Sequence, residues 1–445
     1  MVSTRILLLS LLYGSAVFAA PTQVRKSKEV VHMNKNNNGT NSSSSNSKSN
    51  SSSSNNNNNN IAGAAYFITN EPAGNFVVAA AIHDDGSLTF DRAVSTRGVG
   101  QHGITDPNGP DPLFSQGAVK ASAAAKVLAA VNPGSNTLTL FSINDKNPVD
   151  ISVIGQPQST EGEFPISVAF NKAGTQACVL NGGQVNNVNC FKVDQDKGLQ
   201  PIQNTLRSIG VNQTTPATGP ADSASHVIFS EDDSKLIASI KGDPKNPGFL
   251  AVWDVSSDGS LSQNFAKISA PQGGALPFGM SVIQGKNAVL ATDAGIGFDV
   301  IDLSNVNSRN SNSSNSKDVS VEVKDQKAVC WAAHSGKTGN FYLTDIGTSK
   351  VTEVSVDDNL KATIVNQYQQ TENSATTDDD VATINNKDFL YVLQPNATSV
   401  AVLSLDAPGK ATNVGNFNLK DVADKAGLTV NANNLSGMTT FVVSQ

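Results

Sequence analysis

The hydrophobic and polar positions of this chain repeat one pattern seven times. In the clearest copy, residues 127–143, an apolar strand leads into a tight turn and then into a second strand with alternating apolar residues. Pro133 and Gly134 mark the turn, because they supply a fixed φ and a positive φ at little steric cost. The pattern is typical of a β-hairpin. Hairpins are therefore expected at residues 66–82, 127–143, 178–193, 236–255, 289–303, 341–356 and 389–405.

Each hairpin ends its first strand on a polar residue, and these residues recur at similar intervals along the chain. A single hairpin cannot bury its apolar face, so a repeat of this kind becomes stable by stacking on its neighbours. The polar residues are Asn70, Asn132, Asn181, Lys241, Asp293, Asp345 and Gln394.

Each repeat extends to four strands. An inner strand rich in small and apolar residues precedes six of the hairpins, and a fourth strand such as 88–95 or 360–368 follows. Four-stranded units at this period predict propeller blades, whereas a parallel sheet would alternate strands with helices. One helical turn is expected, at 421–426. The inner strands are expected at 117–122, 165–170, 226–230, 278–283, 330–334 and 381–384.

The first hairpin has no inner strand before it, because a run of asparagines precedes Ile61. The C-terminal segment 435–443 has the composition of the inner strands. We expect it to complete the first blade and to hide the strand edges that an open array would expose. The sequence therefore predicts an all-β fold, a seven-bladed β-propeller over residues 61–445 that is closed by the C-terminal strand.

The first 60 residues differ from the rest. Residues 1–19 have the features of a signal peptide, with Arg5 before an apolar stretch and small residues before a cut after Ala19. Residues 20–60 are rich in Asn and Ser and are expected to form a disordered spacer, while a second such tract, 305–316, forms a surface loop. No later segment has the ~20 apolar residues that span a bilayer. We expect a secreted, extracellular protein, free or held at the cell wall.

In a secreted chain the Asn-X-Ser/Thr motifs are candidate glycan sites on exposed segments. A net charge of −7 makes nucleic acid an unfavourable partner. We expect a monomer without metal or cofactor, whose partner is an extracellular protein, a glycan or a small neutral ligand. The glycosylation motifs lie at Asn38, Asn41, Asn50, Asn212, Asn312, Asn396 and Asn434.

The chain has three cysteines. Cys178 and Cys190 lie on the two strands of one hairpin, and they face each other if it has the register of the 127–143 copy. An oxidising compartment permits a disulfide there, although cross-strand geometry is demanding. Two interpretations stay open, a disulfide or two small buried side chains. Cys330 is expected to be unpaired and buried.

Five phrases carry a family resemblance. They are T-N-E-P-A-G-N (69–75), S-Q-G-A-V (115–119), A-V-N-P-G-S-N-T (130–137), P-F-G-M (277–280) and C-W-A-A-H-S-G-K-T-G-N-F-Y-L-T (330–344). Through them the chain resembles, over roughly residues 61–443, the lactonase family of seven-bladed propellers, which includes fungal carboxymuconate cyclases and bacterial 6-phosphogluconolactonases. The resemblance implies a propeller fold and, in active members, the opening or closing of a lactone.

Lactone chemistry needs a general acid or base and a cationic clamp for carboxylates. Active members of the family place Pro-His before one inner strand and Pro-Arg-His before another. Here the first motif has Ile166 in place of its His, and the second keeps His226 but has Ser225 in place of Arg. The family's Asn-Glu pair is retained at residues 70–71, but in another blade.

In a propeller, the connections from fourth to first strands share a face with the turns between second and third strands. On that face Glu71 and His226 are the candidate catalytic pair, unless His226 only bonds a neighbouring blade and Glu71 only caps a turn. The run 378–380 either holds a hard cation through its carboxylates or forms a solvated acidic turn. Trp331 and His334 are expected in the core and rim, with His334 towards the opposite face. The candidate binding residues are His102, Lys241, Asp378 and Asp380.

Two functions follow. The first is a glycosylated, lactonase-like propeller that acts as an extracellular binding protein with a degenerate site. The alternative is a lactonase or carboxymuconate cycloisomerase that uses His226 and Glu71. Arginine is scarce, and the realistic sources of a cationic clamp are Arg92, Arg97 and Arg207. Two or more basic side chains converging on His226 would favour the enzyme, whereas the acidic residues of the predicted face, which include Glu161 and Glu163, would repel an anionic substrate.

Overall fold

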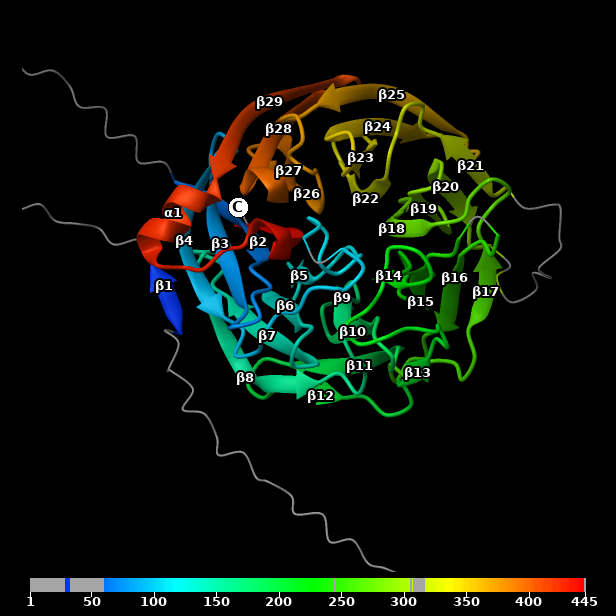
Figure 1. The fold of residues 1–445 in the computed structure, drawn as a ribbon, viewed down its shortest axis with the longest axis horizontal. Coiled ribbons are helices and arrows are strands. Elements are labelled where there is room, and N and C mark those ends of the chain that lie inside the picture. Colours follow the sequence, from blue (N-terminus) through cyan, green and yellow to red (C-terminus); the bar gives the residue numbers. More distant parts are fainter. Residues whose placement is uncertain are drawn as a thin grey trace, which may run out of the picture.

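The computed structural model describes residues 29–32, 60–106, 108–243, 245–304, 306 and 317–443. Seven antiparallel sheets stand around a central axis, so the chain is a seven-bladed β-propeller, as the hairpin repeat predicts (Figure 1). In each blade the first strand lies nearest the axis and the fourth lies at the rim.

The blades are numbered by the order of their hairpins, and their strands are given from the axis outwards. Blade 1 has β30 (Ser436–Val442), β2 (Ile61–Ile68), β3 (Phe76–His83), β4 (Leu88–Ser95) and β1 (Val30–His32). Blade 2 has β5 (Val119–Ser122), β6 (Val127–Asn132), β7 (Thr137–Ile143) and β8 (Ile151–Ser159). Blade 3 has β9 (Pro165–Phe170), β10 (Gln176–Asn181), β11 (Asn187–Asp194) and β12 (Gly198–Pro201), with β13 (Arg207–Ser208) also paired to β11.

Blades 4 to 7 repeat the four-strand plan. Blade 4 has β14 (Ala224–Phe229), β15 (Lys235–Ile240), β16 (Phe249–Asp254) and β17 (Ala266–Ser269), and blade 5 has β18 (Pro277–Val282), β19 (Ala288–Asp293), β20 (Gly297–Asp302) and β21 (Val319–Glu322). Blade 6 has β22 (Val329–His334), β23 (Phe341–Asp345), β24 (Lys350–Val356) and β25 (Ala362–Gln369). Blade 7 has β26 (Asp379–Ile384), β27 (Lys387–Gln394), β28 (Ser399–Ala407) and β29 (Lys410–Asn418). The short helices are η2 (Pro395–Ala397), α1 (Leu419–Ala426) and η3 (Ala432–Asn434).

The C-terminal strand β30 closes the ring, as predicted. It pairs antiparallel with β2, with Gly63 opposite Val442, and the Val443 amide donates to the Ala62 carbonyl (2.9 Å). The first blade is therefore built from both ends of the propeller, and its inner edge is covered.

The first blade also has a fifth strand that the sequence does not predict. β1 pairs with the rim strand β4, and Val31 is buried in the core shared by blades 1 and 7. The prediction of a structureless spacer over residues 20–60 is therefore wrong at 29–32. The predicted signal peptide and, except for Val306, the second Asn/Ser tract lie outside the described residues.

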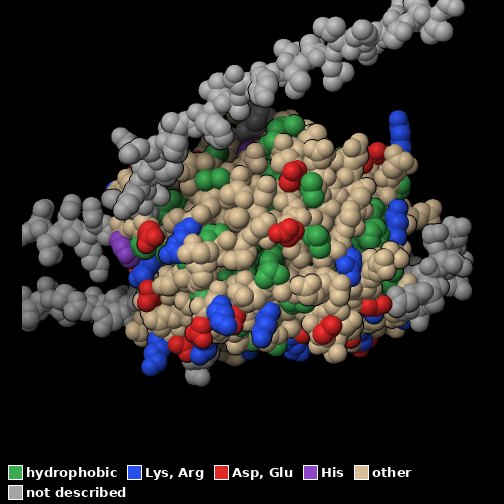
Figure 2. All heavy atoms as spheres, turned by 90° about the horizontal axis from the view of Figure 1, so that it is seen from below, with side chains coloured by type: hydrophobic (Ala, Val, Ile, Leu, Met, Phe, Trp, Pro, Cys, Tyr) green, Lys and Arg blue, Asp and Glu red, His purple; other side chains and the backbone are tan. Residues whose placement is uncertain are grey.

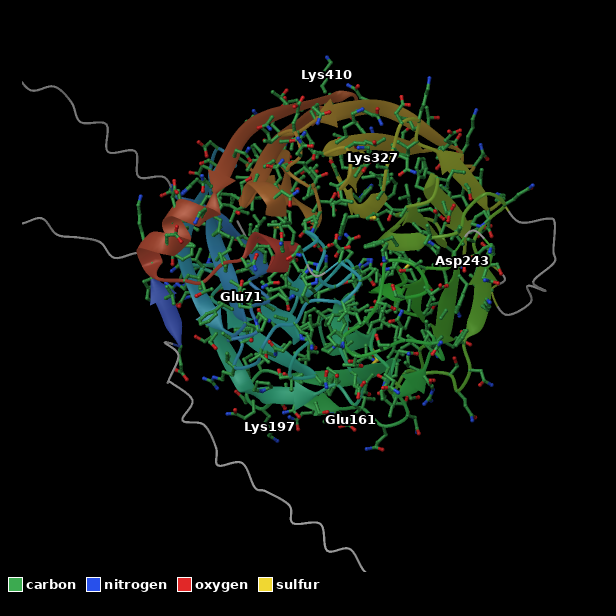
Figure 3. All side chains as sticks on the ribbon, in the orientation of Figure 1. Glu71, Glu161, Lys197, Asp243, Lys327 and Lys410 are labelled. Carbon is green, nitrogen blue, oxygen red and sulfur yellow. A yellow bond between two sulfur atoms is a disulfide. The ribbon has the colours of Figure 1, made fainter. Side chains whose placement is uncertain are left out.

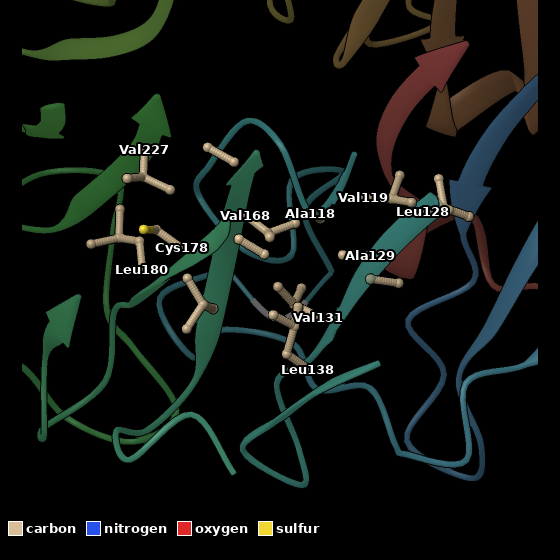
Figure 4. Close-up of a cluster of buried hydrophobic side chains, with 14 of the residues drawn as sticks. Ala118, Val119, Leu128, Ala129, Val131, Leu138, Val168, Cys178, Leu180 and Val227 are labelled. Atoms are coloured by element: carbon tan, nitrogen blue, oxygen red, sulfur yellow. The ribbon is translucent and has the colours of Figure 1, made fainter. Parts of the chain in front are cut away.

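The second strand of a blade is apolar on both faces, because a blade covers it on either side. All residues of β6 and of β10 are buried. Figure 4 shows Leu128 and Leu180 of these strands in one cluster with Val168 of β9 and Val227 of β14. This double burial explains the uninterrupted apolar run that opens each hairpin, whereas the rim strand β25 is mostly exposed.

The polar residues that end the second strands are all buried, and those at 293 and 345 show their role. The Asp293 carboxylate accepts hydrogen bonds from the amides of Ala275 and Leu276, which enter the same blade, at 2.7 and 2.9 Å. It also accepts from the Gly295 amide (2.8 Å), within the next turn. The buried Asp293 side chain thus satisfies the backbone of two loops at once.

The outer wall of the ring is mixed in character. Figure 2 shows acidic and basic side chains interspersed among polar ones, with hydrophobic side chains exposed in small separate groups. The helix α1 contains the predicted helical turn; the side chain of Asn418 caps its start, and Gly427 ends it with φ 70°. Over the residues that the structure describes, no helix has the length and apolarity to cross a membrane.

Candidate functional site

The two faces of the ring have different roles at the central channel. We call the face that carries the connections from fourth to first strands the loop face, and the face that carries the turns from first to second strands the turn face. The long connection between β4 and β5 reaches the axis on the loop face (cyan in Figure 1). We call its residues 113–117 the plug.

The plug spans the channel, because hydrogen bonds attach it to opposite blades. The Gln116 side chain donates to the Ala332 carbonyl (3.0 Å) and accepts from the Ala332 amide (3.2 Å) of blade 6. The Trp331 indole donates to the Ser115 carbonyl at 2.9 Å. On the other side, Ser115 Oγ donates to the Ile166 carbonyl of blade 3 at 2.9 Å. The loop face of the channel, where the sequence predicts the site, is therefore closed.

The open half of the channel is a cavity of about 550 Å³ that faces the turn side. The inner strands of all seven blades line it, and Gln116 and Gly117 form its inner end. Its walls are partly apolar, with Val168, Met280 and Met438 among them. Its polar lining consists of Gln116, Lys120, Ser122, Asn171, Lys172, His226, Ser281, His334, Asp379 and Asp380.

His226 lies on β14, deep in this cavity. Its Nδ1 accepts a hydrogen bond from the Met280 amide at 3.0 Å. Burial lowers the pKa of His226 to about 3, with a smaller contribution from the charge of Lys120, so the ring is neutral at pH 7. Since Nδ1 is the acceptor, the ring proton is on Nε2. His226 is thus fixed as a hydrogen-bond donor to the cavity and is not available there as a base.

Glu71 is not brought together with His226. Glu71 Oε1 accepts from the Asn431 amide at 2.7 Å, and Glu71 is absent from the lining of the cavity. Figure 3 shows Glu71 beside β2, away from the channel strands of blade 4. The predicted catalytic pair is therefore not assembled, and the simpler interpretation, in which Glu71 ties a loop and His226 bonds the neighbouring blade, is the one observed.

Lys241 holds the plug and does not reach the cavity. Its ammonium donates to the carbonyls of Phe114 and Ala224 and lies 4.2 Å from the centre of the Phe278 ring. Burial lowers the pKa of Lys241 to about 7 and raises that of the nearby Asp111 to about 6. Neither residue lines the cavity. The predicted binding role of Lys241 is therefore replaced by a structural one.

The His102 side chain also interacts with the backbone and not with the cavity. Its two ring nitrogens lie 2.7 Å from the Gly103 carbonyl and 3.0 Å from the Gly109 carbonyl, both within the β4–β5 connection. Of the predicted acidic residues on this face, Glu161 is exposed and Glu163 accepts a hydrogen bond from Thr215. None of the three lines the cavity.

The acidic run 378–380 is not a solvated turn, because Asp378 and Asp379 are buried. Asp378 accepts from the Gly437 amide (2.9 Å), and Asp380 accepts from the Thr440 amide (2.7 Å) and hydroxyl (3.1 Å). Both residues thus hold the closing strand β30. Within the described part of the chain, no group of His, Cys, Asp and Glu side chains is arranged to hold a metal ion.

Asp379 stands apart from its neighbours. Both of its carboxyl oxygens are buried without a hydrogen-bond partner, and the residue lines the cavity. Burial, and then the charges of Asp378 and Asp380, raise its pKa well above the usual value, while Lys120 opposes the shift. Burial also raises the pKa of Asp378 to about 7. Burial therefore favours the protonated form of Asp379 in the folded protein.

We predict that Asp379→Asn stabilises the protein at pH 7 by about 1–2 kcal/mol. The unfolded carboxyl ionises near pH 3.8 and the folded one well above it, so unfolding releases a proton in between and wild-type stability falls as pH rises through that window. The Asp379→Asn variant has no ionisable group at this position, so its stability does not fall in this way as pH rises. Urea unfolding at pH 7 and pH 4 should show the gain at pH 7 alone. The control is Asp380→Asn, which weakens the contact with Thr440 and should destabilise the protein at pH 7. Equal stability of the wild type and Asp379→Asn at pH 7 would contradict the raised pKa of Asp379.

The arginines do not supply a clamp. Arg92 pairs with Asp91 (2.8 Å) and Asp150 (2.7 Å), and Arg97 lies 3.8 Å from Glu29. Arg207 donates to the backbone carbonyls of blade 4, at residues 261 and 262. Lysines line the cavity in their place, at 120 and 172. Lys120 could have been recognised in the sequence as a candidate site residue, because it is a charged residue within an inner strand of small and apolar residues.

The cysteines and glycosylation motifs can also be placed. Cys178 and Cys190 face each other and form a disulfide with an S–S distance of 2.06 Å. Cys330 is free and buried, and burial raises its pKa well above the usual value.

Asn212 and Asn396 are exposed, but Asn434 is only 7% exposed, so the expectation of an exposed motif is wrong there. The other four motifs, at Asn38, Asn41, Asn50 and Asn312, lie outside the described residues.

With this geometry established, the chain can be compared with known proteins. A family model described as lactonase, 7-bladed beta-propeller, matches residues 54–214. The periplasmic gluconolactonase of Pseudomonas aeruginosa has a similar structure, with a TM-score of 0.58 at 14% identity over 85% of this chain and 100% of that one. The chain is a seven-bladed propeller that is similar to the lactonase family.

Further solved structures have this lactonase-type fold. A putative 6-phosphogluconolactonase of Bacteroides fragilis matches with a TM-score of 0.57 and 13% identity, over 85% of this chain and 98% of that one. A functionally unknown protein of Desulfotomaculum acetoxidans matches with a TM-score of 0.54 and 12% identity, over 85% and 99% of the two chains. No curated protein sequence matches. At these identities the likeness establishes the fold of the lactonase-type propeller, and its activity is a separate question.

Proposed function

We propose that this lactonase-type propeller is a secreted binding protein whose predicted catalytic site is degenerate. The observation that carries the proposal is the plug. It closes the loop face, so that His226 is reached from the turn face while Glu71 remains tied to the Asn431 amide. A lactonase needs a base to activate water or the ring. Of the candidate bases in the cavity, His226 carries its ring proton on Nε2, the pKa of Asp379 is raised by burial, and Asp380 is engaged by Thr440.

Three features support an extracellular location. The first residues have the features of a signal peptide, and Asn212 and Asn396 present glycosylation motifs on exposed segments. The disulfide between Cys178 and Cys190 suits an oxidising compartment. We therefore place the binding function outside the cell, in solution or at the cell wall.

One observation favours a second candidate, lactone hydrolysis from the turn face. Lys120 and Lys172 line the same cavity as His226, which meets the criterion of two basic groups around that residue. A neutral imidazole N–H can polarise a carbonyl. The cavity would then act on a small lactone, with water as the nucleophile and no assigned base.

A lactone panel tests the two candidates. We predict no turnover of 6-phosphogluconolactone or carboxymuconate above the rate in buffer, because no base and no Arg fork faces the cavity. If a neutral lactone is hydrolysed, His226→Ala should abolish the activity while secretion and Tm stay close to wild type. The expected readout is a flat pH-stat trace. Sustained turnover of either anionic substrate would overturn the binding proposal.

A further inference from the structure

We infer that the turn-face cavity binds a small organic carboxylate, which the Lys120 ammonium and the His226 Nε2–H hold at its inner end. The inference rests on the proposed binding function and names the ligand class of that site. The cavity opens on the turn face, on the opposite side of the plug from the face where the sequence predicts the site.

The charges in the cavity favour an anion. Among the described residues, neither the Lys120 nor the Lys172 ammonium has an ion-pair or hydrogen-bond partner, and both side chains line the cavity. Against them stands the Asp380 side chain, which Thr440 already engages. Burial raises the pKa of Asp379 well above its usual value, which disfavours its charged form, and burial lowers the pKa of His334, so that ring is neutral at pH 7. Unpaired cations in a recess are stabilised when an anion enters.

The inner end of the cavity has donors in the right place. Lys120, His226 and Asp379 line the same cavity, and the charge of Lys120 affects the pKa of both other groups. His226 Nε2 has no hydrogen-bond partner in the described part of the chain, and Gly117 keeps it accessible, since a Cβ there would lie 3.1 Å from Nε2. A carboxylate can accept from the ammonium and from the imidazole at the same time. The buried, unpartnered Asp379 carboxyl supplies a further O–H beside them.

The rest of the lining defines the class of anion. Among the described residues, no arginine and no helix N-terminus lines the cavity, so these residues offer no bidentate or backbone donors of the kind that suit a phosphate dianion. Val168, Phe229, Met280 and Met438 provide an apolar wall around the polar end. The volume of about 550 Å³ lies in the range of ligand pockets. A monoanionic carboxylate with a small apolar body fits this arrangement.

Isothermal titration of the full secreted chain with benzoate tests the inference, with benzamide as the neutral isostere. We expect saturable binding of benzoate, with benzamide and inorganic phosphate at least about tenfold weaker, since a hydrogen bond to a charged group contributes about 1.5–3 kcal/mol. Lys120→Met should weaken benzoate about tenfold or more, and Lys120→Arg should retain it. Lys197→Met, which removes an exposed ammonium outside the cavity lining, should stay within about twofold.

A second variant covers the case in which Lys120→Met does not fold. His226→Asn can keep an acceptor near the Met280 amide while it removes Nε2–H, and it should weaken benzoate about threefold or more. Equal affinity for benzoate and benzamide, benzoate binding unchanged in both variants, or no benzoate binding at millimolar concentration would each overturn the inference. If the ligand class is wrong, the lactone panel still shows no turnover. If the binding proposal itself is wrong, the panel shows turnover, so the two failures can be told apart.

Discussion

Truncation before residue 435 is expected to abolish folding of the propeller. Strand β30 supplies the inner edge of blade 1 and buries Leu435, Met438 and Phe441. Burial of each such side chain contributes about 1.5–3 kcal/mol, so their sum is comparable to the whole stability of a typical domain, about 5–15 kcal/mol. The exposed edge of β2 would then favour aggregation.

The measurement is the yield of soluble, unaggregated protein by gel filtration, together with its thermal unfolding. A chain that ends after Val443 is the matched control, because it keeps β30 and its last amide bond to Ala62. The control should match wild type. A soluble monomer lacking 435–445 with an unchanged Tm would show that β30 does not close the ring in solution.

Asp345→Ala is expected to be the most destabilising single substitution at the blade-end polar positions, with a loss of about 3–5 kcal/mol in the free energy of unfolding. The Asp345 carboxylate accepts from four backbone amides, those of Lys327, Ala328, Gly347 and Thr348, at 2.9–3.1 Å. Alanine would remove the one buried carboxylate that serves all four of these partly buried amides.

Urea unfolding measures the loss, and Asp357→Ala is the matched control. Asp357 also accepts from two turn amides, those of Asn359 and Lys361, but on an exposed turn where water can replace it. Its loss should therefore be much smaller than that of Asp345→Ala. Similar losses at the two positions would mean that burial of the Asp345 contacts adds nothing.

The fold could be predicted because the pattern of apolar and polar residues that defines each blade is local in the sequence. Hairpin, turn and inner strand recur within each repeat, and an absent inner strand at one end matched a spare strand at the other. β1 escaped prediction because three residues, Val30–His32, are too few to show a period within an Asn/Ser-rich region. Its burial depends on the edge of β4, far along the chain.

The site could be predicted only in part. His226 is in the channel, as the resemblance implied, but the path of the plug depends on contacts such as Gln116 with Ala332, which are 216 residues apart. No local pattern reports such a contact. The run 378–380 looks like a solvated turn by composition, and its burial arises when β30 packs over it. The open face of the channel therefore followed from tertiary packing alone.

The closing ladder also determines how the ring would respond to mechanical force. β2 and β30 are antiparallel, with Gly63 opposite Val442 at the end where the chain enters and leaves the ring. A pull that separates residues 60 and 443 would load these backbone hydrogen bonds one after another, as in a zipper, rather than all together in shear. The ring would thus open progressively, one hydrogen bond after another, when it is stretched between its own two ends.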